Sequence, residues 1–553
     1  MTRRSNCADG AARSARRAVR LSLALPLAWS LSLLLPCAAC GPDAPAPPRA
    51  PSAARDARPF TPWHPIDAPS PFPEGEWYWQ ELFAVAPAPE PLPADPAAAA
   101  EIAATLERIA GLELLQSESE LPGLVALARR DLAALLAALD DPRPEARFAA
   151  ARVMVRLMTA RTRPEGCPFP QRLVAAAAVH LRDRADDVAL LHLETIARGG
   201  YPWSWPVLLK CFGKLDNHRL TVLRVRAAAL LAMQGCYGGM PLLIKVLKEG
   251  TSIQDDRNRE WDPSFQTAWW KEEAIAGIAA VAGQKFGHSP DASDADQVAA
   301  VRRIEAWWQA NAIELYAKAP PLDDPELIAR IRLLIRSFGT FQLRNVDNAG
   351  FLLAALGPGV VPHLFEALDG SSFMVRRHVL AVLAELAPRV AVEVRQRWLT
   401  RLLPLLTEGA GELVPFALQA VGALRIDAAL PHLEAALRPE APEACEAALY
   451  QLSRQSPRLA REVLQRFATK LPPQHRLTTP LAAARLRAGD LAPLPEYLKR
   501  LSGEANSDAR AQLYLSWIVD FDGWSDAKTA EERRTALERI EAEIRARAAS
   551  SGS

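Results

Sequence analysis

The sequence predicts an all-α fold, an α-solenoid in which antiparallel helix pairs stack into a superhelical array. Three observations lead to this prediction. Apolar residues recur at helical spacing over most of the chain, signals for strands are nearly absent, and one two-helix pattern repeats along the chain. A single helix pair cannot bury both of its faces, but stacked neighbours can. The repetition therefore favours a stack over one globular core.

The helical pattern begins near residue 97 and continues to about residue 548. Runs such as "RRDLAALLAALDD" and "ARFAAARVMVRLM" place apolar residues three and four positions apart, the spacing that puts them on one face of a helix. We expect Leu132 and Leu136 in the first run, and Met154 in the second, to be buried between helices. The alternation of valine, isoleucine and threonine that is typical of strands is rare.

The first helix of each unit is predicted to begin with an apolar residue followed by proline. Proline suits the first turn of a helix because its missing N–H has no acceptor there. Six stretches share this start: "WPVLLKCFGK", "MPLLIKVLKEG", "VPHLFEALDG", "LPLLTEG", "LPHLEAALRP" and "LPEYLKRLSG", with Pro206, Pro241, Pro362, Pro404, Pro431 and Pro495. Gaps of 35, 42 and 27 residues between neighbouring prolines lie around the period of two-helix repeats.

The second helices also match one another, in "ARFAAARVM", "VRAAALLAM" and "VRRHVLAVL". Together with "LAALDDPRPEARFAAARVM", these units resemble bacterial HEAT repeats of the short kind also seen in phycobilisome-lyase-like proteins, over roughly residues 124–520. The resemblance implies that a turn aspartate, here Asp141, and a second-helix arginine, here Arg147, help to lock adjacent repeats. The arginine position is also matched by Arg226 and Arg376, whose nearest turn aspartates are Asp216 and Asp369.

Residues 1–39 predict an export signal. Six arginines precede the apolar stretch "LSLALPLAWSLSLLLP", and small residues end it. The following "CAACG" resembles a bacterial lipobox in which Cys40 receives the lipid, although Cys37 replaces the usual leucine. We therefore expect an exported lipoprotein of the cell envelope, and the resemblance favours the outer membrane because Gly41 follows Cys40. A plain signal peptide or an uncleaved anchor is the alternative.

Residues 40–96 predict a proline- and alanine-rich tether. Sixteen of the 46 prolines fall between Gly41 and Pro96, a composition typical of extended, semi-rigid linkers. A short aromatic segment at 76–86 is expected to cap an exposed end of the array. The solenoid at 97–548 is expected to contain a connector insertion around 251–310.

Within that insertion, "GQKFGHSPDASDADQVAAVRRIEAWWQAN" combines a histidine with Asp291, Asp294 and Asp296. These aspartates suggest a cation loop, but the calcium-loop pattern with its central glycine is missing. Asp294 or Asp296 can instead cap the helix that follows. We therefore predict a connector and no metal.

Catalytic and cofactor motifs are missing from the sequence: it holds no P-loop, no G-x-S-x-G and no dinucleotide fingerprint. The histidines His180, His192, His363 and His432 lack ligand spacing and are expected to be structural. We therefore predict a protein that is not an enzyme and needs no cofactor. A net charge of +1 without a concentrated basic surface does not suggest nucleic-acid binding. The cysteines Cys167, Cys211, Cys236 and Cys445 are expected to be separate buried thiols rather than disulfides.

The predicted function is a non-enzymatic, membrane-tethered scaffold that binds a protein or peptide partner through its concave surface. Candidate partner-binding residues are the second-helix arginines, which could instead pair with acids on adjacent repeats: Arg147, Arg152, Arg156, Arg224, Arg226, Arg376 and Arg377. One alternative is an accessory or lyase-like maturation factor. Another is a cell-wall glycan binder that uses the tryptophan-rich region with Trp203, Trp205, Trp261, Trp269 and Trp270.

Overall fold

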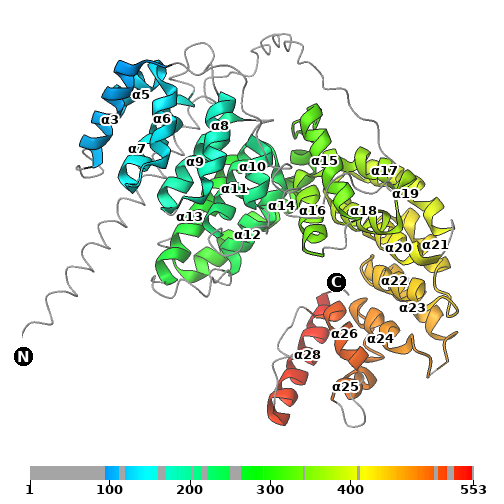
Figure 1. Cartoon of the computed structure of the whole chain (residues 1–553). Helices are drawn as coiled ribbons and strands as arrows, with labels where there is room; N and C mark the ends of the chain where they lie inside the picture. Colours follow the sequence, from blue (N-terminus) through cyan, green and yellow to red (C-terminus); the bar gives the residue numbers. More distant parts are fainter. Residues whose placement is uncertain are drawn as a thin grey trace, which may run out of the picture. The chain divides into compact units, whose positions relative to one another are not determined.

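The protein is described by a computed structural model (Figure 1). It describes residues 94–550 except 111–118, 160–169, 184, 201–203, 213–220, 250–262, 290–291, 340–342, 408–410, 473, 503–508 and 520–528. The predicted signal segment, Cys40, the aromatic segment and the tether up to residue 93 lie outside the described residues. The same holds for Cys167, Trp203, Asp216, Trp261, Asp291 and the side chain of Trp269. All regular structure in the described ranges is helical, so the predicted all-α class is confirmed.

The helices form antiparallel pairs, and the second helices of successive pairs pack directly on one another. One series of second helices is α7 (Pro144–Leu157), α9 (Asp186–Gly199), α11 (Thr221–Met233) and α13 (Pro263–Ala282). The other is α16 (Leu343–Leu356), α18 (Phe373–Leu386), α20 (Val414–Ala423), α22 (Pro442–Leu452), α24 (Thr478–Arg487) and α26 (Ala509–Ile518). Such serial stacking of helix pairs is an α-solenoid, as predicted.

Each pair is held by contacts between its first helix and its second helix. The first helices of the earlier series are α5 (Leu121–Arg130) with α6 (Leu132–Ala137), α8 (Pro170–Val179), α10 (Ser204–Phe212) and α12 (Met240–Glu249). Those of the later series are α17 (Val361–Gly370), α19 (Val392–Leu402), α21 (Leu430–Ala435), α23 (Pro457–Ala468) and α25 (Leu494–Ser502). Four further described helices lie outside these pairs. Of these, α3 (Pro96–Ala110) packs on α5, α6 and α7, and α28 (Ala530–Ser550) packs on α24 and α25. The other two are α14 (Asp294–Ala317) and α15 (Pro325–Ser337).

The predicted proline starts are confirmed in five of the six stretches. Proline is the second residue of α12, α17, α21 and α25 and the third of α10. The exception is Pro404, which lies in a 3-10 helix, Leu403–Leu406, directly after α19. In that pair the first helix is α19, which begins at Val392 without a proline.

The chain divides into two compact units. Among the described residues, the first unit comprises 94–311 together with 318–327, and the second comprises 312–317 together with 328–550. The division falls inside α14 (Asp294–Ala317) and α15. In the part of the chain that the structure describes, no single helix has the length and apolar composition to cross a membrane, and one sharply bent pair, 348–356 with 358–370, meets both criteria.

Small side chains let neighbouring second helices approach closely. Ala227, Ala228 and Ala229 on α11 are each at most 1% exposed. A Cβ added to Gly277 of α13 would lie 2.6 Å from the Cβ of Ala229. The core between repeats is therefore built from backbone contact as well as from large side chains.

The predicted burial of Leu136 is wrong by one residue. Leu132 and Met154 are buried as expected, but Leu135 has no exposed surface while Leu136 is half-buried. Leu135 and Leu136 lie three and four residues after Leu132, so both fall near its face of the helix, and the packing buries the first of them. The first helix is broken at Asp131 and restarts as α6, and the Asp131 side chain caps α6 by accepting a hydrogen bond from Ala134 N (2.8 Å).

Candidate functional site

Arg147 of α7 holds two successive repeats together. Its Nε and Nη2 donate to the two carboxylate oxygens of Asp183 at 2.6 and 3.0 Å, and its Nη1 donates to the Asp141 carbonyl at 2.9 Å. Burial alone would raise the pKa of Asp183, but the Arg147 hydrogen bonds and charge hold it below its ordinary value. The carboxylate that pairs with Arg147 thus belongs to the turn of the next repeat.

Asp141, the aspartate that the resemblance assigned to this lock, uses its carboxylate locally. It accepts hydrogen bonds from Arg143 Nε and Nη2, both at 2.9 Å. These hydrogen bonds lower the pKa of Asp141 to about 2. Arg147 therefore receives a hydrogen-bond acceptor from the Asp141 backbone, and the Asp141 carboxylate acts on it only through its charge.

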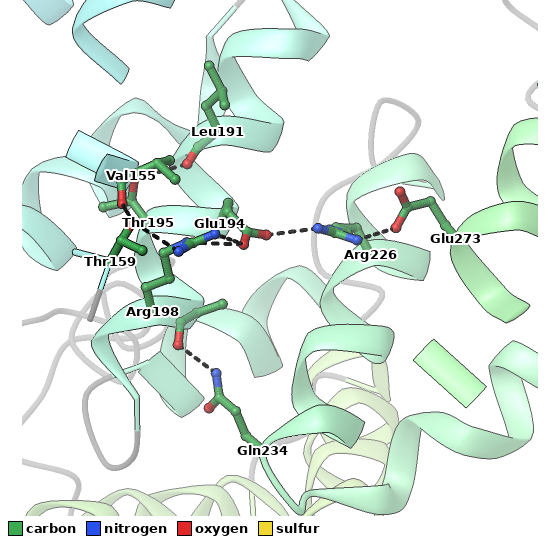
Figure 2. A network of polar contacts seen from close by, with 10 residues as sticks. Val155, Thr159, Leu191, Glu194, Thr195, Arg198, Arg226, Gln234 and Glu273 are labelled. Atoms are coloured by element: carbon green, nitrogen blue, oxygen red, sulfur yellow. Dashed lines mark hydrogen bonds and ion pairs between the residues drawn. The ribbon is translucent and has the colours of Figure 1, made fainter. Parts of the chain in front are cut away.

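Arg226 of α11 links three second helices. It donates from Nη2 to Glu194 of α9 at 2.8 Å and from Nη1 to Glu273 of α13 at 2.6 Å (Figure 2). Arg198, one turn after Glu194, donates to the same glutamate from Nε at 3.2 Å and to Thr159 Oγ1 from Nη1 at 3.1 Å. We call Glu194, Arg198, Arg226 and Glu273 the buried ion network.

The charges of the buried ion network balance. It contains two carboxylates and two guanidinium groups, and each side chain is at most 11% exposed. Burial would raise the pKa of Glu194, but Arg226 and Arg198 outweigh it and keep the pKa low. Likewise burial would lower the pKa of Arg226, and Glu273 and Glu194 raise it instead. Glu194 and Arg226 are therefore both held in their ionised forms, and Arg226 serves as a lock between repeats.

Side-chain donors also cap the ends of neighbouring second helices. The last carbonyls of a helix lack an intrahelical partner, and here another repeat supplies one. Gln234 Nε2 donates to Ala197 O and Gln455 Nε2 donates to Gly422 O, both at 2.8 Å. These capping contacts add a second layer of polar attachment between repeats.

The other five predicted arginines do not share one environment. Arg152 is 3% exposed, with its guanidinium 5.7 Å from the Phe148 ring. Arg156, Arg224 and Arg376 are half-buried, and burial lowers the pKa of Arg224. Arg377 lies over the Phe416 ring at 4.6 Å. Partner binding by any of the seven stays a prediction.

Asp369, the aspartate nearest to Arg376 in the sequence, pairs with Arg401 of α19 at 3.0 Å. The arginine–aspartate lock proposed for that repeat is therefore made with a different arginine.

The loop between α13 and α14 acts as a connector. Ser293 Oγ accepts from Asp296 N at 3.2 Å and donates to the Asp296 carboxylate at 2.7 Å, a reciprocal arrangement that caps the start of α14. The expectation that Asp294 or Asp296 is itself the cap is therefore corrected: Ser293 caps the helix and Asp296 is its partner. Phe286 O accepts from Arg303 Nε at 3.0 Å, and the Phe286 ring packs 5.6 Å from Trp307.

The described histidines and tryptophans of the predicted sites are packed against neighbouring side chains. His192 has no exposed surface and lies 5.7 Å from the ring of His180. His363 is 3.7 Å from Glu366 on its own helix, and His432 is half-buried. Trp205 and Trp270 are 1% and 6% exposed, so neither offers a face on which a sugar could stack. Cys211, Cys236 and Cys445 are buried, as expected.

The chain was compared with protein families, curated proteins and solved structures. No protein-family profile and no curated protein matches the chain. A crystal structure of Kap121p bound to Nup53p is similar over 83% of this chain and 49% of its own, with 13% identity and a TM-score of 0.28. An engineered protein is similar over 84% of this chain and 99% of its own, with 16% identity and a TM-score of 0.20.

This chain therefore spans about half the length of the Kap121p chain. At these TM-scores neither likeness carries an argument. The assignment as an α-solenoid rests on the packing of the helix pairs.

Proposed function

We propose that the protein is a non-enzymatic, membrane-tethered scaffold that binds a protein or peptide partner through the surface lined by its second helices. The observation that supports this is the serial stacking of second helices within each unit. Small rotations between stacked repeats produce extended concave surfaces, which repeat proteins use for binding. The buried ion network and the capping contacts keep successive repeats in register, so such a surface would be preorganised.

The use of buried charges also favours a scaffold over an enzyme. Glu194, Arg226 and Glu273 are the kind of buried ionisable groups that often mark catalytic sites. Here they neutralise one another between α9, α11 and α13. Their chemistry is used for attachment between helices.

Site-specific photo-cross-linking tests the binding surface. A cross-linking amino acid would replace Ala381 on α18 or Ser516 on α26, which are exposed positions on second helices. Matched positions on first helices are Thr400 on α19 and Lys499 on α25, also exposed. In envelope extracts we expect a discrete cross-linked partner from the second-helix positions only. Equal yields from both sets would refute binding through this surface.

The tether is tested separately. Cys40→Ser should abolish labelling with a lipid precursor and release the protein from membranes, because the proposed attachment rests on that thiol. Cys445→Ser, a buried position in α22, is the control and should remain membrane-bound. A labelled, membrane-bound Cys40→Ser protein would show that the lipobox interpretation is wrong.

A further inference from the structure

Three arginines and two aromatic residues of the second unit lie together on its surface. Arg395 comes from α19, Arg425 follows α20, Arg454 follows α22, Tyr450 lies on α22 and Trp517 lies on α26. Arg425 and Arg454 are exposed, and the other three are half-buried. We call these five residues the arginine–aromatic patch.

Arg425 occupies a backbone position that elsewhere belongs to glycine. Its φ is +48°, in the left-handed region that residues with a Cβ rarely adopt. Other second helices are also followed by a residue with a positive φ, and in each of these cases the residue is a glycine: Gly200, Gly235, Gly283, Gly357 or Gly489. Strained residues of this kind cluster at functional sites. The exchange of glycine for arginine at this one helix end therefore points to a use for the side chain.

The positive charge of the patch is not neutralised within the described part of the chain. Arg395 Nε and Nη1 donate to the carbonyls of Val390 and Leu424, at 2.9 and 3.1 Å, and Arg454 Nη1 donates to the Tyr450 hydroxyl at 3.0 Å. None of the three arginines forms an ion pair with a described carboxylate. Burial, and then the charges of Arg454 and Arg395, lower the pKa of Arg425. An anion placed among these groups would relieve this repulsion.

The aromatic rings lie beside the charges. The Tyr450 and Trp517 ring centroids are 4.8 Å apart, and Tyr514 of α26 packs edge-on against Trp517 at 4.7 Å. The Arg454 guanidinium lies 5.4 Å from the centre of the Tyr450 ring. The patch thus offers an apolar platform next to guanidinium donors, which suits a ligand with an apolar group adjacent to an anionic one.

We propose that the arginine–aromatic patch binds an acidic segment of a partner protein, with an aspartate or glutamate carboxylate between the guanidinium groups and a neighbouring apolar side chain on Tyr450 and Trp517. This inference rests on the proposed scaffold function and names its ligand class. A membrane or nucleic acid needs a broad basic surface, whereas the whole chain has a net charge of only +1. Three local guanidinium groups match a short acidic segment better.

Arg425→Gly separates binding from folding. Glycine adopts the left-handed conformation without strain, so the thermal unfolding midpoint of the variant should equal or exceed that of the wild type. The variant removes one guanidinium group from the patch. Arg397→Gln is the matched control, because Arg397 is exposed on the same helix as Arg395 and loses the same charge.

The test uses a random-peptide display library selected against the full chain. Peptides retained by the wild type and by Arg397→Gln should be enriched in aspartate or glutamate beside an aromatic or aliphatic residue, and Arg425→Gly should lose this enrichment. For one selected peptide, fluorescence anisotropy should give a dissociation constant at least about tenfold higher for Arg425→Gly than for the wild type. This is the loss of affinity expected when a hydrogen bond to a charged group is removed. Raising the salt concentration should weaken wild-type binding.

The outcomes distinguish the two proposals. Selected peptides without acidic bias, or acidic peptides that bind Arg425→Gly as well as the wild type, would overturn the assignment of the patch and leave the scaffold function standing. If neither the wild type nor either variant retains peptides above background, the scaffold function itself would be overturned. Vesicles of anionic lipid that bind the patch more tightly than the selected peptide would replace the acidic segment with a membrane surface as the ligand.

Discussion

Arg226 lies between two buried carboxylates, and its positive charge compensates theirs. Its side chain is 11% exposed, and Glu194 and Glu273 on either side are 3% and 5% exposed. A buried ion pair is weak evidence for stability in itself, but removal of one partner is costly because it leaves a buried charge uncompensated.

We therefore expect Arg226→Met to lower the free energy of unfolding by ~3–5 kcal/mol, measured by chemical denaturation at pH 7. The control is Arg466→Met. Arg466 pairs with Glu434 at 2.7 Å, but the two side chains are 59% and 46% exposed, so this change should cost less than ~1 kcal/mol. Similar losses for both variants would mean that the network is open to solvent.

His192 makes stability depend on pH. Burial, and then the charge of His180, lower its pKa to about 4, against a smaller opposing effect of Asp183. In the unfolded chain the pKa of histidine is about 6.5. Between these values the unfolded chain binds a proton that the folded chain does not. Neutral His192 therefore contributes its full stability above about pH 6.5, and this contribution is lost as the pH falls toward 4.

The two pKa values predict a loss of roughly 3 kcal/mol between pH 7 and pH 4. His192→Leu should remove this part of the pH dependence, measured as the difference in unfolding free energy between the variant and the wild type. His432→Leu, at a half-buried position, should leave it in place. A His192→Leu protein with the same pH profile as the wild type would contradict the assignment.

At the scale of the helices, the closeness of α11 and α13 depends on Gly277. A Cβ at this position would lie 2.6 Å from the Cβ of Ala229 and 2.9 Å from its Cα. The Cα belongs to the backbone of α11 and cannot move without the helix. The two helices would have to separate.

Gly277→Ala should therefore destabilise the protein by ~1–3 kcal/mol through overpacking, measured by chemical denaturation. Gly123→Ala provides the opposite case. Gly123 lies inside α5 with nothing within 4 Å of an added Cβ, and alanine forms helices better than glycine by up to ~1 kcal/mol. Gly123→Ala should therefore raise the free energy of unfolding, whereas Gly277→Ala should lower it. Stabilisation by Gly277→Ala would show that α13 can shift freely along α11.

At the scale of the whole molecule, each repeat contacts mainly its neighbours, so damage should spread only locally. Leu135→Ala removes a side chain with no exposed surface from α6 and should cost ~2–5 kcal/mol. Hydrogen exchange on the full chain should then show loss of protection in the first unit before the second. Leu418→Ala, equally buried in α20, should produce the reverse order. Uniform loss of protection along the chain would contradict independent units.

The fold class and the positions of the helix pairs could be predicted from the sequence because their causes are local. A proline in the first turn and apolar residues at helical spacing act over a few residues, and five of the six predicted proline starts are observed within a helix's first three positions. Residue-level burial was less predictable. Leu135 and Leu136, three and four residues after Leu132, both fall near the same face of α6, so local periodicity did not decide which of them is fully buried.

The polar attachments depended on partners that local patterns do not specify. Arg147 was identified from its motif, but its carboxylate partner is Asp183, 36 residues away. Arg226 joins Glu194 and Glu273, 32 and 47 residues distant, and neither glutamate stands in a recognisable pattern. For the arginine–aromatic patch, the one available signal was "GALRID", where the chain places arginine at a helix end that elsewhere carries glycine.

By itself, then, the sequence determined that this protein is a stack of helix pairs, because helical periodicity and turn residues are properties of short segments. The tertiary structure decided which charges neutralise one another between repeats and which remain open to a partner. An ionisable side chain acquires its role from the groups packed against it, and in a stacked array those groups come from the preceding and following repeats. Arg226, within α11, is enclosed by glutamates, whereas Arg425, after the end of α20, faces solvent among like charges.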